Sequence, residues 1–324
     1  MKFSILKEPN SYALIGVFIL LFIIMGCEHE NGSTLLYTDI VTQTIKDSSY
    51  NCTYSFVTDP QKDKASILIY LHGAGGDSKS IFKSNPDEIN ELLNHPDGPS
   101  TIISISFGPY WLLTFNKLPD TETLHIPVSI FHRLISQEII PPFSDTDSKV
   151  MIMGHSMGGH NAAQAAFRYP ETYHKVLILS PSYLPISPFA SINVKKEFAL
   201  KAEMKYGSLK SRVKQMITGT GYIEDRVLDI FEKQKAKYIT EQNWNNQDFI
   251  PLLERPNIIY PETYISCGIN DPFALMEGSL SLYNKLIEIQ NPVTFDPLKG
   301  GHNVFNWPYI INFITDNQTA PVVR

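Results

Sequence analysis

The sequence is poor in cysteine and in clustered charge. Only three cysteines occur among 324 residues, and no segment repeats or has low complexity. So few cysteines make a poor disulfide framework, which argues against the small secreted folds that disulfide bonds hold together. The net charge is −6 and no basic cluster is present, which argues against nucleic acid as a partner.

Motifs for metals and nucleotides are also lacking. The nine histidines show no H-E-x-x-H or similar ligand spacing, so the sequence implies no metal site. The glycine cluster in "LHGAGGD" (71–77) lacks the Lys-Ser/Thr ending of a phosphate-binding loop, and no G-x-G-x-x-G occurs. We therefore predict a protein that works without a metal or any other cofactor.

The first 27 residues have the pattern of an export signal. Lys2 and Lys7 precede an unbroken apolar stretch, Ala13–Gly26, and Cys27 follows it directly. A basic start, a short apolar stretch and a small residue before the cleavage point are typical of a secretory signal peptide. A cysteine at the next position resembles the bacterial lipobox, in which that cysteine carries lipid. An uncleaved signal anchor is the alternative, but the stretch is short for a membrane span of about 20 residues.

This pattern divides the chain into three predicted parts. Residues 1–26 are a lipoprotein-type signal peptide, residues 27–34 are a tether, and residues 35–324 are a single domain. Removal of two lysines and one glutamate with the signal takes the net charge from −6 to −7. We expect an exported protein that Cys27 anchors to a bacterial membrane through lipid, in the periplasm or at the cell surface.

Two cysteines remain if Cys27 carries lipid. Cys52 and Cys267 both lie in apolar runs of the kind that form strands. Buried thiols are common in such runs, so we expect two free thiols rather than one bridge.

Short apolar runs recur through the rest of the chain and predict strands. The runs that are continuously apolar are "SILIYL" (66–71), "TIISIS" (101–106), "KVMIMG" (149–154), "KVLILS" (175–180) and "TYISCG" (263–268). Continuous apolarity is typical of parallel strands that are covered on both faces. Helical stretches alternate with these runs, notably Met157–Arg168 and Phe273–Ile289, and two β-rich runs between residues 35 and 58 precede them. The alternation predicts an α/β fold with a mostly parallel, doubly wound sheet and an N-terminal antiparallel hairpin.

One segment, between Pro181 and Pro261, breaks this alternation. It is rich in Lys and Glu and has helical spacing, with two apolar stripes that are separated by glycines: Leu209, Val213, Met216 and Ile217, and then Val227, Ile230 and Phe231. We predict a helical insertion at about residues 182–260 that forms a cap over the carboxyl edge of the sheet. Long insertions commonly carry function, although a surface decoration is the alternative.

Ser156 is the candidate nucleophile. It lies in "GHSMG" (154–158), which matches G-x-S-x-G and joins an apolar strand to an alanine-rich helix. That context is the one the motif requires, because a strained turn lifts the serine Oγ above the sheet and glycines on either side make room for it. A tight glycine turn around a structural serine is the alternative, and the strand and helix disfavour it.

A serine hydroxyl needs a base, and the base needs an acid to orient it. In the hydrolase order the serine comes first, then the acid, then the histidine. His302 comes late enough in the chain, whereas His160 and His174 come too early. For the acid we favour Asp271, in the loop directly after a predicted strand, over Asp296, which lies at a strand end six positions before His302.

The charge that forms on an attacked carbonyl needs preset N–H donors. One is the backbone N–H of Met157, the residue after the nucleophile. The second should come from the sharp glycine turn that follows the strand ending at Leu71. We assign it to the N–H of Ala74, with Gly73 as the alternative.

These motifs together resemble the putative-esterase family of α/β-hydrolases, which includes esterase D (S-formylglutathione hydrolase), feruloyl esterases and mycolyltransferases. "GHSMGGH" is similar to the esterase D turn, "CGINDPF" to the acid turn of the family, and "GGHNVFNW" to its histidine loop. The resemblance covers the chain roughly from Ser66 onward and implies an α/β-hydrolase fold. It also implies Ser156 as nucleophile, Asp271 as acid and His302 as base.

We therefore predict an exported serine esterase that acts on a small-molecule or glycan ester. A peptidase of the same fold is one alternative, and a non-catalytic surface-binding lipoprotein is another. Tyr110, Trp111 and Tyr183 follow strand ends and hint at a pocket for an aryl group or a sugar.

Overall fold

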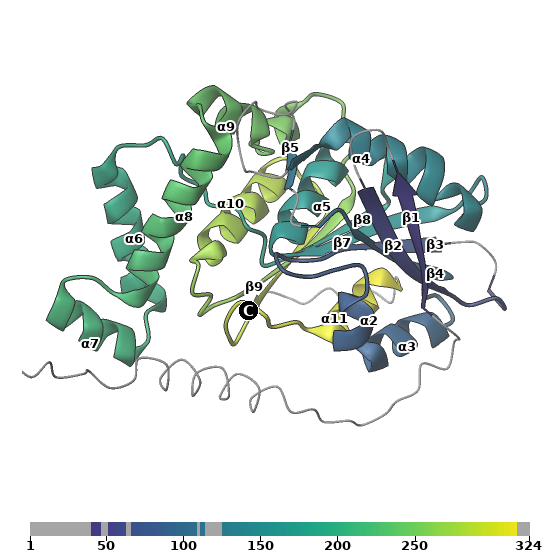
Figure 1. Cartoon of the computed structure of the whole chain (residues 1–324), viewed down its shortest axis with the longest axis horizontal. Coiled ribbons are helices and arrows are strands. Elements are labelled where there is room, and N and C mark those ends of the chain that lie inside the picture. Colours follow the sequence, from purple (N-terminus) through teal and green to yellow (C-terminus); the bar gives the residue numbers. More distant parts are fainter. Residues whose placement is uncertain (1–39, 47–50, 63–65, 109–110, 114–124, 316–324) are drawn as a thin grey trace, which may run out of the picture. The chain divides into compact units, whose positions relative to one another are not determined.

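An eight-stranded sheet in the order β1-β2-β4-β3-β7-β8-β9-β10 organises the part of the chain that the structure describes (Figure 1). Its strands are β1 (Val41–Lys46), β2 (Asn51–Thr58), β3 (Ser66–Leu71), β4 (Thr101–Ser106), β7 (Lys149–His155), β8 (Lys175–Leu179), β9 (Glu262–Gly268) and β10 (Val293–Leu298). The structure is a computed structural model, and it describes residues 40–46, 51–62, 66–108, 111–113 and 125–315. All of these described residues belong to one compact unit.

The sheet has the predicted mixture of strand directions. β1 and β2 form an antiparallel hairpin, β2 runs antiparallel to β4, and all pairs from β4 to β10 are parallel. The five continuously apolar runs are β3, β4, β7, β8 and β9. Parallel strands are buried on both faces, which is why these runs do not alternate.

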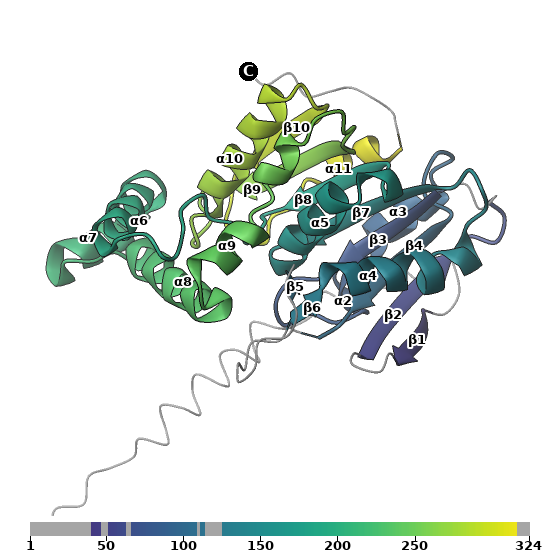
Figure 2. The same cartoon turned by 90° about the horizontal axis from the view of Figure 1, so that it is seen from above.

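Helices cover both faces of the sheet (Figure 2). On one face lie α4 (Val128–Leu134), α5 (Met157–Arg168) and α10 (Leu275–Glu288), and on the other lie α2 (Ser80–Ser84), α3 (Pro86–Asn94) and α11 (Trp307–Ile314). Alternate residues of β3 point into the two resulting cores: Ile67 and Ile69 into the first, Leu68 and Tyr70 into the second. The predicted doubly wound α/β fold is confirmed.

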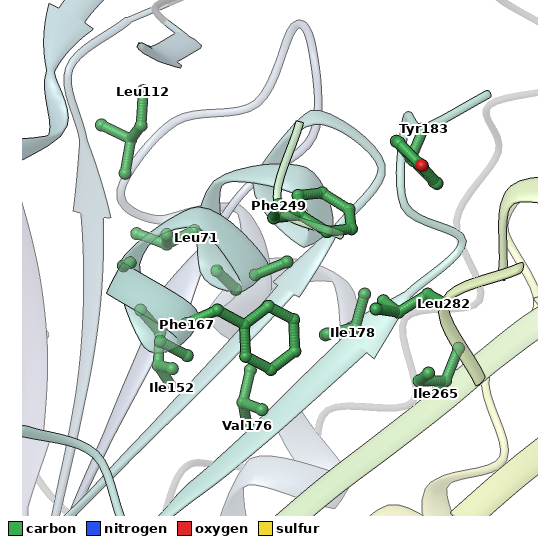
Figure 3. Packing of buried hydrophobic residues seen from close by; sticks show 14 of the residues in the cluster. Leu71, Leu112, Ile152, Phe167, Val176, Ile178, Tyr183, Phe249, Ile265 and Leu282 are labelled. Atoms are coloured by element: carbon green, nitrogen blue, oxygen red, sulfur yellow. The ribbon is translucent and has the colours of Figure 1, made fainter. Parts of the chain in front are cut away.

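The helix α5 packs closely on the strands beneath it. Four of its alanines (162, 163, 165 and 166) are completely buried, which brings the helix backbone near the sheet. Phe167, near the end of the helix, lies over Ile152 of β7 and Val176 of β8 (Figure 3). This packing fixes the start of α5 at the carboxyl end of β7, where Ser156 stands.

Several shorter elements complete the described chain. They are β5 (Trp111–Leu113) and β6 (His125–Pro127), which pair with each other, the π-helix η1 (Ile135–Ile139), and the 3-10 helices η2 (Pro141–Phe143), η3 (Pro170–Thr172) and η4 (Pro251–Glu254).

The segment between β8 and β9 is helical. It contains α6 (Ile192–Tyr206), α7 (Leu209–Thr218), α8 (Tyr222–Tyr238) and α9 (Glu241–Gln247), and the first three group together at one side of the sheet (Figure 1, Figure 2). Of the two apolar stripes in the sequence, the one on α8 is packed inward, with Val227 and Phe231 fully buried. The stripe on α7 is not, since Met216 is 85% exposed and Leu209 is 79% exposed. No residue of α7 lines the cavity described below, so its apolar stripe does not form part of the site.

The two remaining cysteines are free and buried, as expected. Cys52 lies on β2 and Cys267 on β9, and burial raises the pKa of each thiol to about 12. Within the described ranges, no helix is both long and apolar enough to cross a membrane. The predicted signal peptide, the tether with Cys27, and Tyr110 all lie outside the described residues.

Candidate active site

Ser156 occupies a turn with an uncommon backbone conformation. It stands between β7 and α5 with φ 57° and ψ −116°, in a region of φ that non-glycine residues rarely adopt. Its N–H donates to the carbonyl of Leu179 at 2.9 Å, and its own carbonyl accepts from the N–H groups of His160 and Ser182, each at 3.0 Å. These bonds hold the turn on both sides, so the surrounding structure sustains the strain.

The glycines of the motif are required by close contacts between backbones. A Cβ atom on Gly154 would lie 2.0 Å from the carbonyl oxygen of Gly158. A Cβ atom on Gly158 would lie 1.9 Å from the carbonyl oxygen of Leu71, at the end of β3. No side chain fits at either position, and the turn therefore lies directly beside the end of β3.

His302 and Asp271 form a hydrogen-bonded pair. His302 Nδ1 lies 2.7 Å from Asp271 Oδ2, and the Asp271 side chain is fully buried. The other carboxylate oxygen of Asp271 accepts the N–H of Phe273 at 2.8 Å. Asp271 follows β9 and His302 follows the neighbouring parallel strand β10, so both loops lie at the carboxyl edge of the sheet.

Asp296 has different partners. Its Oδ2 accepts the hydroxyl of Tyr264 at 2.8 Å and the side-chain amide of Asn306 at 2.8 Å. Asp296 thus ties β10 to β9 and to the loop before α11. Of the two candidate acids, Asp271 is the one that the structure pairs with His302.

The hydroxyl of Ser156 has a partner that the sequence did not suggest. Its Oγ lies 3.2 Å from the Oγ of Ser182, which follows β8. Ser156 and His302 line the same cavity. The only sign of Ser182 in the sequence is that it follows the end of a predicted strand. Many other polar residues do the same, so this position alone did not identify it.

His155, the variable residue before the nucleophile, supports the histidine loop. Its Nε2 donates to the backbone carbonyl of His302 at 3.0 Å, and its ring packs against the rings of His302 and Phe305 at centroid distances of 4.9 and 5.0 Å. Burial lowers the pKa of His155 to about 4, so the ring is neutral at pH 7. The motif permits any residue here, which is why the sequence gave no sign of this contact.

The glycine turn after β3 lies against the nucleophile. Gly73 and Ala74 line the cavity, and a Cβ atom on Gly73 would lie 3.3 Å from the Cβ of Ser156. His72 holds this turn, since its Nδ1 donates to the Gly73 carbonyl at 2.7 Å and its Nε2 accepts from the Ser106 hydroxyl at 2.8 Å. The N–H of Met157, in the first turn of α5, has no acceptor within the helix.

A cavity of about 1360 Å³ opens above these residues. Loops at the sheet edge contribute Ser156, His302, Gly73 and Ala74 to its lining, and α8 and Trp111 contribute to it as well. The α8 residues in this lining are Ile230, Lys233, Gln234 and Lys237. The insertion therefore contributes side chains to the site through α8.

Tyr183 is not part of the cavity wall, which corrects the expectation that it contacts substrate. Its side chain is 4% exposed, its ring packs against Phe249 at 4.6 Å between centroids, and its hydroxyl donates to Asp248 at 3.4 Å (Figure 3). An aromatic residue four positions after a strand can equally turn into the core. In the described parts of the chain, no three His, Cys, Asp or Glu side chains gather as a metal-binding group.

Several known proteins with similar sequences or folds are named esterases. A family model described as "Putative esterase" matches residues 133–249, a range that includes Ser156. A putative esterase/lipase from Haemophilus influenzae is 20% identical over 295 residues, which cover 89% of this chain and 93% of that protein. A solved ferulic acid esterase has a TM-score of 0.54 at 14% identity, with 86% of this chain and 95% of that chain covered.

An esterase from the fungus Rhizomucor miehei has a TM-score of 0.56 at 12% identity, covering 96% of this chain and 97% of that one. These similarities support an esterase function. The chain has the α/β-hydrolase fold, and its resemblance to the putative-esterase family, predicted from the sequence, is confirmed.

Proposed function

We propose that this protein is an exported serine esterase that hydrolyses carboxylic esters of small molecules or carbohydrates through an acyl-enzyme. One observation carries the proposal. Ser156, on its strained turn, and His302, hydrogen-bonded to a buried carboxylate at 2.7 Å, line the same cavity. Nucleophile, base and orienting acid are the groups that ester hydrolysis by a serine requires.

In the first half of the reaction, Ser156 Oγ attacks the carbonyl carbon of the ester. His302 Nε2 takes the hydroxyl proton, and the carbonyl oxygen becomes an oxyanion that accepts from the N–H groups of Met157 and Ala74. The intermediate then collapses. The bond to the alcohol oxygen breaks, His302 returns the proton to that oxygen, and the acyl group stays on Ser156.

In the second half, water replaces the alcohol. His302 takes a proton from the water, the hydroxide attacks the acyl carbon, and the same two N–H groups hold the second oxyanion. Its collapse releases the carboxylic acid and returns the proton to Ser156 Oγ. Asp271 accepts the Nδ1–H of His302 throughout, which leaves Nε2 facing Ser156 and stabilises the imidazolium.

Export is proposed from the N-terminal sequence. The basic start, the apolar stretch Ala13–Gly26 and Cys27 support a signal peptide with a lipid anchor. The substrate would then be met in the periplasm or at the cell surface.

A panel of matched esters and amides tests the proposed reaction. We expect the purified protein to hydrolyse 4-nitrophenyl acetate and butyrate, and feruloyl or acetylated-sugar esters at rates that reveal its preference. The corresponding 4-nitroanilides and aminoacyl amides should react far more slowly. Faster cleavage of the amides would identify a peptidase, and cleavage of neither set would contradict the proposal.

A further inference from the structure

Lys237 of α8 is a buried lysine in the wall of the active-site cavity. The residue is 7% exposed, and it lines the same cavity as Ser156 and His302. Its Nζ lies 3.5 Å from the ring centroid of Trp111 and 4.4 Å from that of Tyr238. Lysine is rarely buried in proteins without a paired charge, so its surroundings call for an explanation.

The other buried lysines in the described chain have carboxylate partners. Lys175 lies 3.6 Å from Glu262, and Lys195 lies 2.9 Å from Glu232. Lys233, one turn before Lys237 on the same helix, pairs with Asp229 at 2.7 Å. Within the described residues, no carboxylate lies within 4 Å of the Lys237 nitrogen and no oxygen accepts from it.

The aromatic rings do not replace such a partner. An ammonium group carries three N–H donors, and ring faces attract the charge without supplying lone pairs to those donors. Burial accordingly lowers the pKa of Lys237 well below its usual value. A charged lysine at this place needs an anion, and the cavity is where one has access.

A second polar group beside Lys237 also lacks a partner. Gln234 lies three residues earlier on α8 and lines the same cavity, and its Oε1 is buried with no hydrogen bond. The two side chains lie on the same face of the helix because residues three apart are neighbours. A Gln side chain offers either an acceptor or two donors, depending on how its amide is turned. Trp111 completes this group with a flat apolar surface.

We propose that Lys237, Gln234 and Trp111 form a subsite for a carboxylate on the ester substrate. This inference rests on the proposed function and names its substrate class: esters whose acyl or alcohol part carries a carboxylate. The carboxylate binds at Lys237 and accepts from Nζ. It also accepts from Gln234 once that amide is turned over, so that its NH₂ group takes the place of the unpartnered Oε1. The adjoining carbon chain or ring lies on Trp111. The ester carbonyl then reaches Ser156 across the same cavity.

Two pairs of substrates test this, one for each part of the ester. In the acyl pair, mono-4-nitrophenyl glutarate is compared with its methyl ester. In the alcohol pair, 4-acetoxybenzoate is compared with methyl 4-acetoxybenzoate. Each pair differs in one carboxylate, so the ratio of kcat/KM values within a pair measures recognition of the anion. We expect the wild-type ratio to favour the carboxylate at least tenfold in one of the two pairs, and that pair identifies which part carries the anion.

Two variants assign the preference to the subsite. In Lys237→Met, which keeps the length of the side chain, we expect that ratio to fall by about 10- to 100-fold, because a hydrogen bond to a charged group is lost. Lys235→Met is the matched control, since Lys235 is an exposed lysine on the same helix that does not line the cavity. It should keep the wild-type ratio.

The wild-type measurement stands even if Lys237→Met does not fold. Hydrolysis of all four esters without preference for the carboxylate would overturn the subsite and leave the proposed esterase function intact. So would a preference that Lys237→Met retains. If the protein hydrolyses none of the four esters, the result contradicts the proposed esterase function and, with it, the carboxylate subsite.

Discussion

Two aspartates near the end of the chain compete for the role of acid, and only Asp271 touches His302. Asp271→Asn keeps the shape of the side chain, but its amide can stabilise the wrong tautomer of His302. The same change in a serine protease lowers turnover by about 10⁴. We expect Asp271→Asn to lose several orders of magnitude in kcat on 4-nitrophenyl acetate at neutral pH.

Asp296→Asn is the matched control for this prediction. Asp296 holds Tyr264 and Asn306 rather than His302, so its variant should stay within about tenfold of wild-type turnover. Circular dichroism checks that both variants fold. If Asp296→Asn is instead the variant that loses several orders of magnitude in kcat, the acid is Asp296 on β10.

We expect His155 to make the stability of the fold depend on pH. Its pKa is about 4 in the folded protein against an ordinary value of 6.5, so the unfolded chain binds the proton first as the pH falls. The stability that the neutral ring contributes is complete above pH 6.5 and is lost between pH 6.5 and 4. In His155→Gln, urea unfolding should show a drop in free energy from pH 7.5 to 5 that is smaller than that of wild type by about 2 kcal/mol. An unchanged drop would mean that another group carries this dependence.

At the scale of elements, the join between β7 and α5 depends on the absence of a side chain at Gly158. A methyl group there would meet the Leu71 carbonyl at 1.9 Å, and neither backbone can move without shifting a strand. We expect Gly158→Ala to destabilise the protein by at least about 3 kcal/mol, measured by urea unfolding.

Gly219→Ala is the comparison for Gly158→Ala. Gly219 has φ +84° in open space, so the added methyl group meets nothing and the cost should be only the backbone strain of about 1–2 kcal/mol. Equal losses in the two variants would show that crowding at Gly158 is not the reason for the glycine.

The elements that the sequence predicted well are those with a local signal. The five parallel strands follow from their continuous apolarity, and the helix Met157–Arg168 follows the strand that ends at the G-x-S-x-G motif. Together they place Ser156 correctly at a strand-to-helix turn. The predictions that failed concern which side of an element is buried. The apolar stripe on α7 was expected to be buried, but it is exposed. Tyr183 was expected to line the substrate pocket, but it is buried in the core.

The site shows the same division between local and tertiary signals. Motif order was enough to select Ser156, Asp271 and His302 as candidates. The contacts of Ser182 and His155 depend on loops that meet at the sheet edge from distant parts of the chain, and no local pattern reports them. Lys237 looks like any lysine of a solvated helix until its burial is known.

At the scale of the whole molecule, the proposed lipid anchor on Cys27 predicts where the protein is found. We expect mass spectrometry of the protein expressed in a bacterium to show Cys27 acylated at the mature N-terminus, with the protein in the membrane fraction. Cys27→Ser should release it from that fraction or leave the signal uncleaved. An unmodified Cys27 in the mature wild-type protein would contradict the lipid anchor.

The most direct test of the whole mechanism is the reaction of Ser156 itself. The wild-type protein should hydrolyse 4-nitrophenyl esters and be labelled covalently by a fluorophosphonate probe. Circular dichroism should show that Ser156→Ala is folded. We expect this variant to be unlabelled by the probe and its kcat to be about 10⁶-fold lower, the loss seen when a triad nucleophile is removed. Wild-type rates of ester hydrolysis in the folded Ser156→Ala variant would contradict a serine esterase.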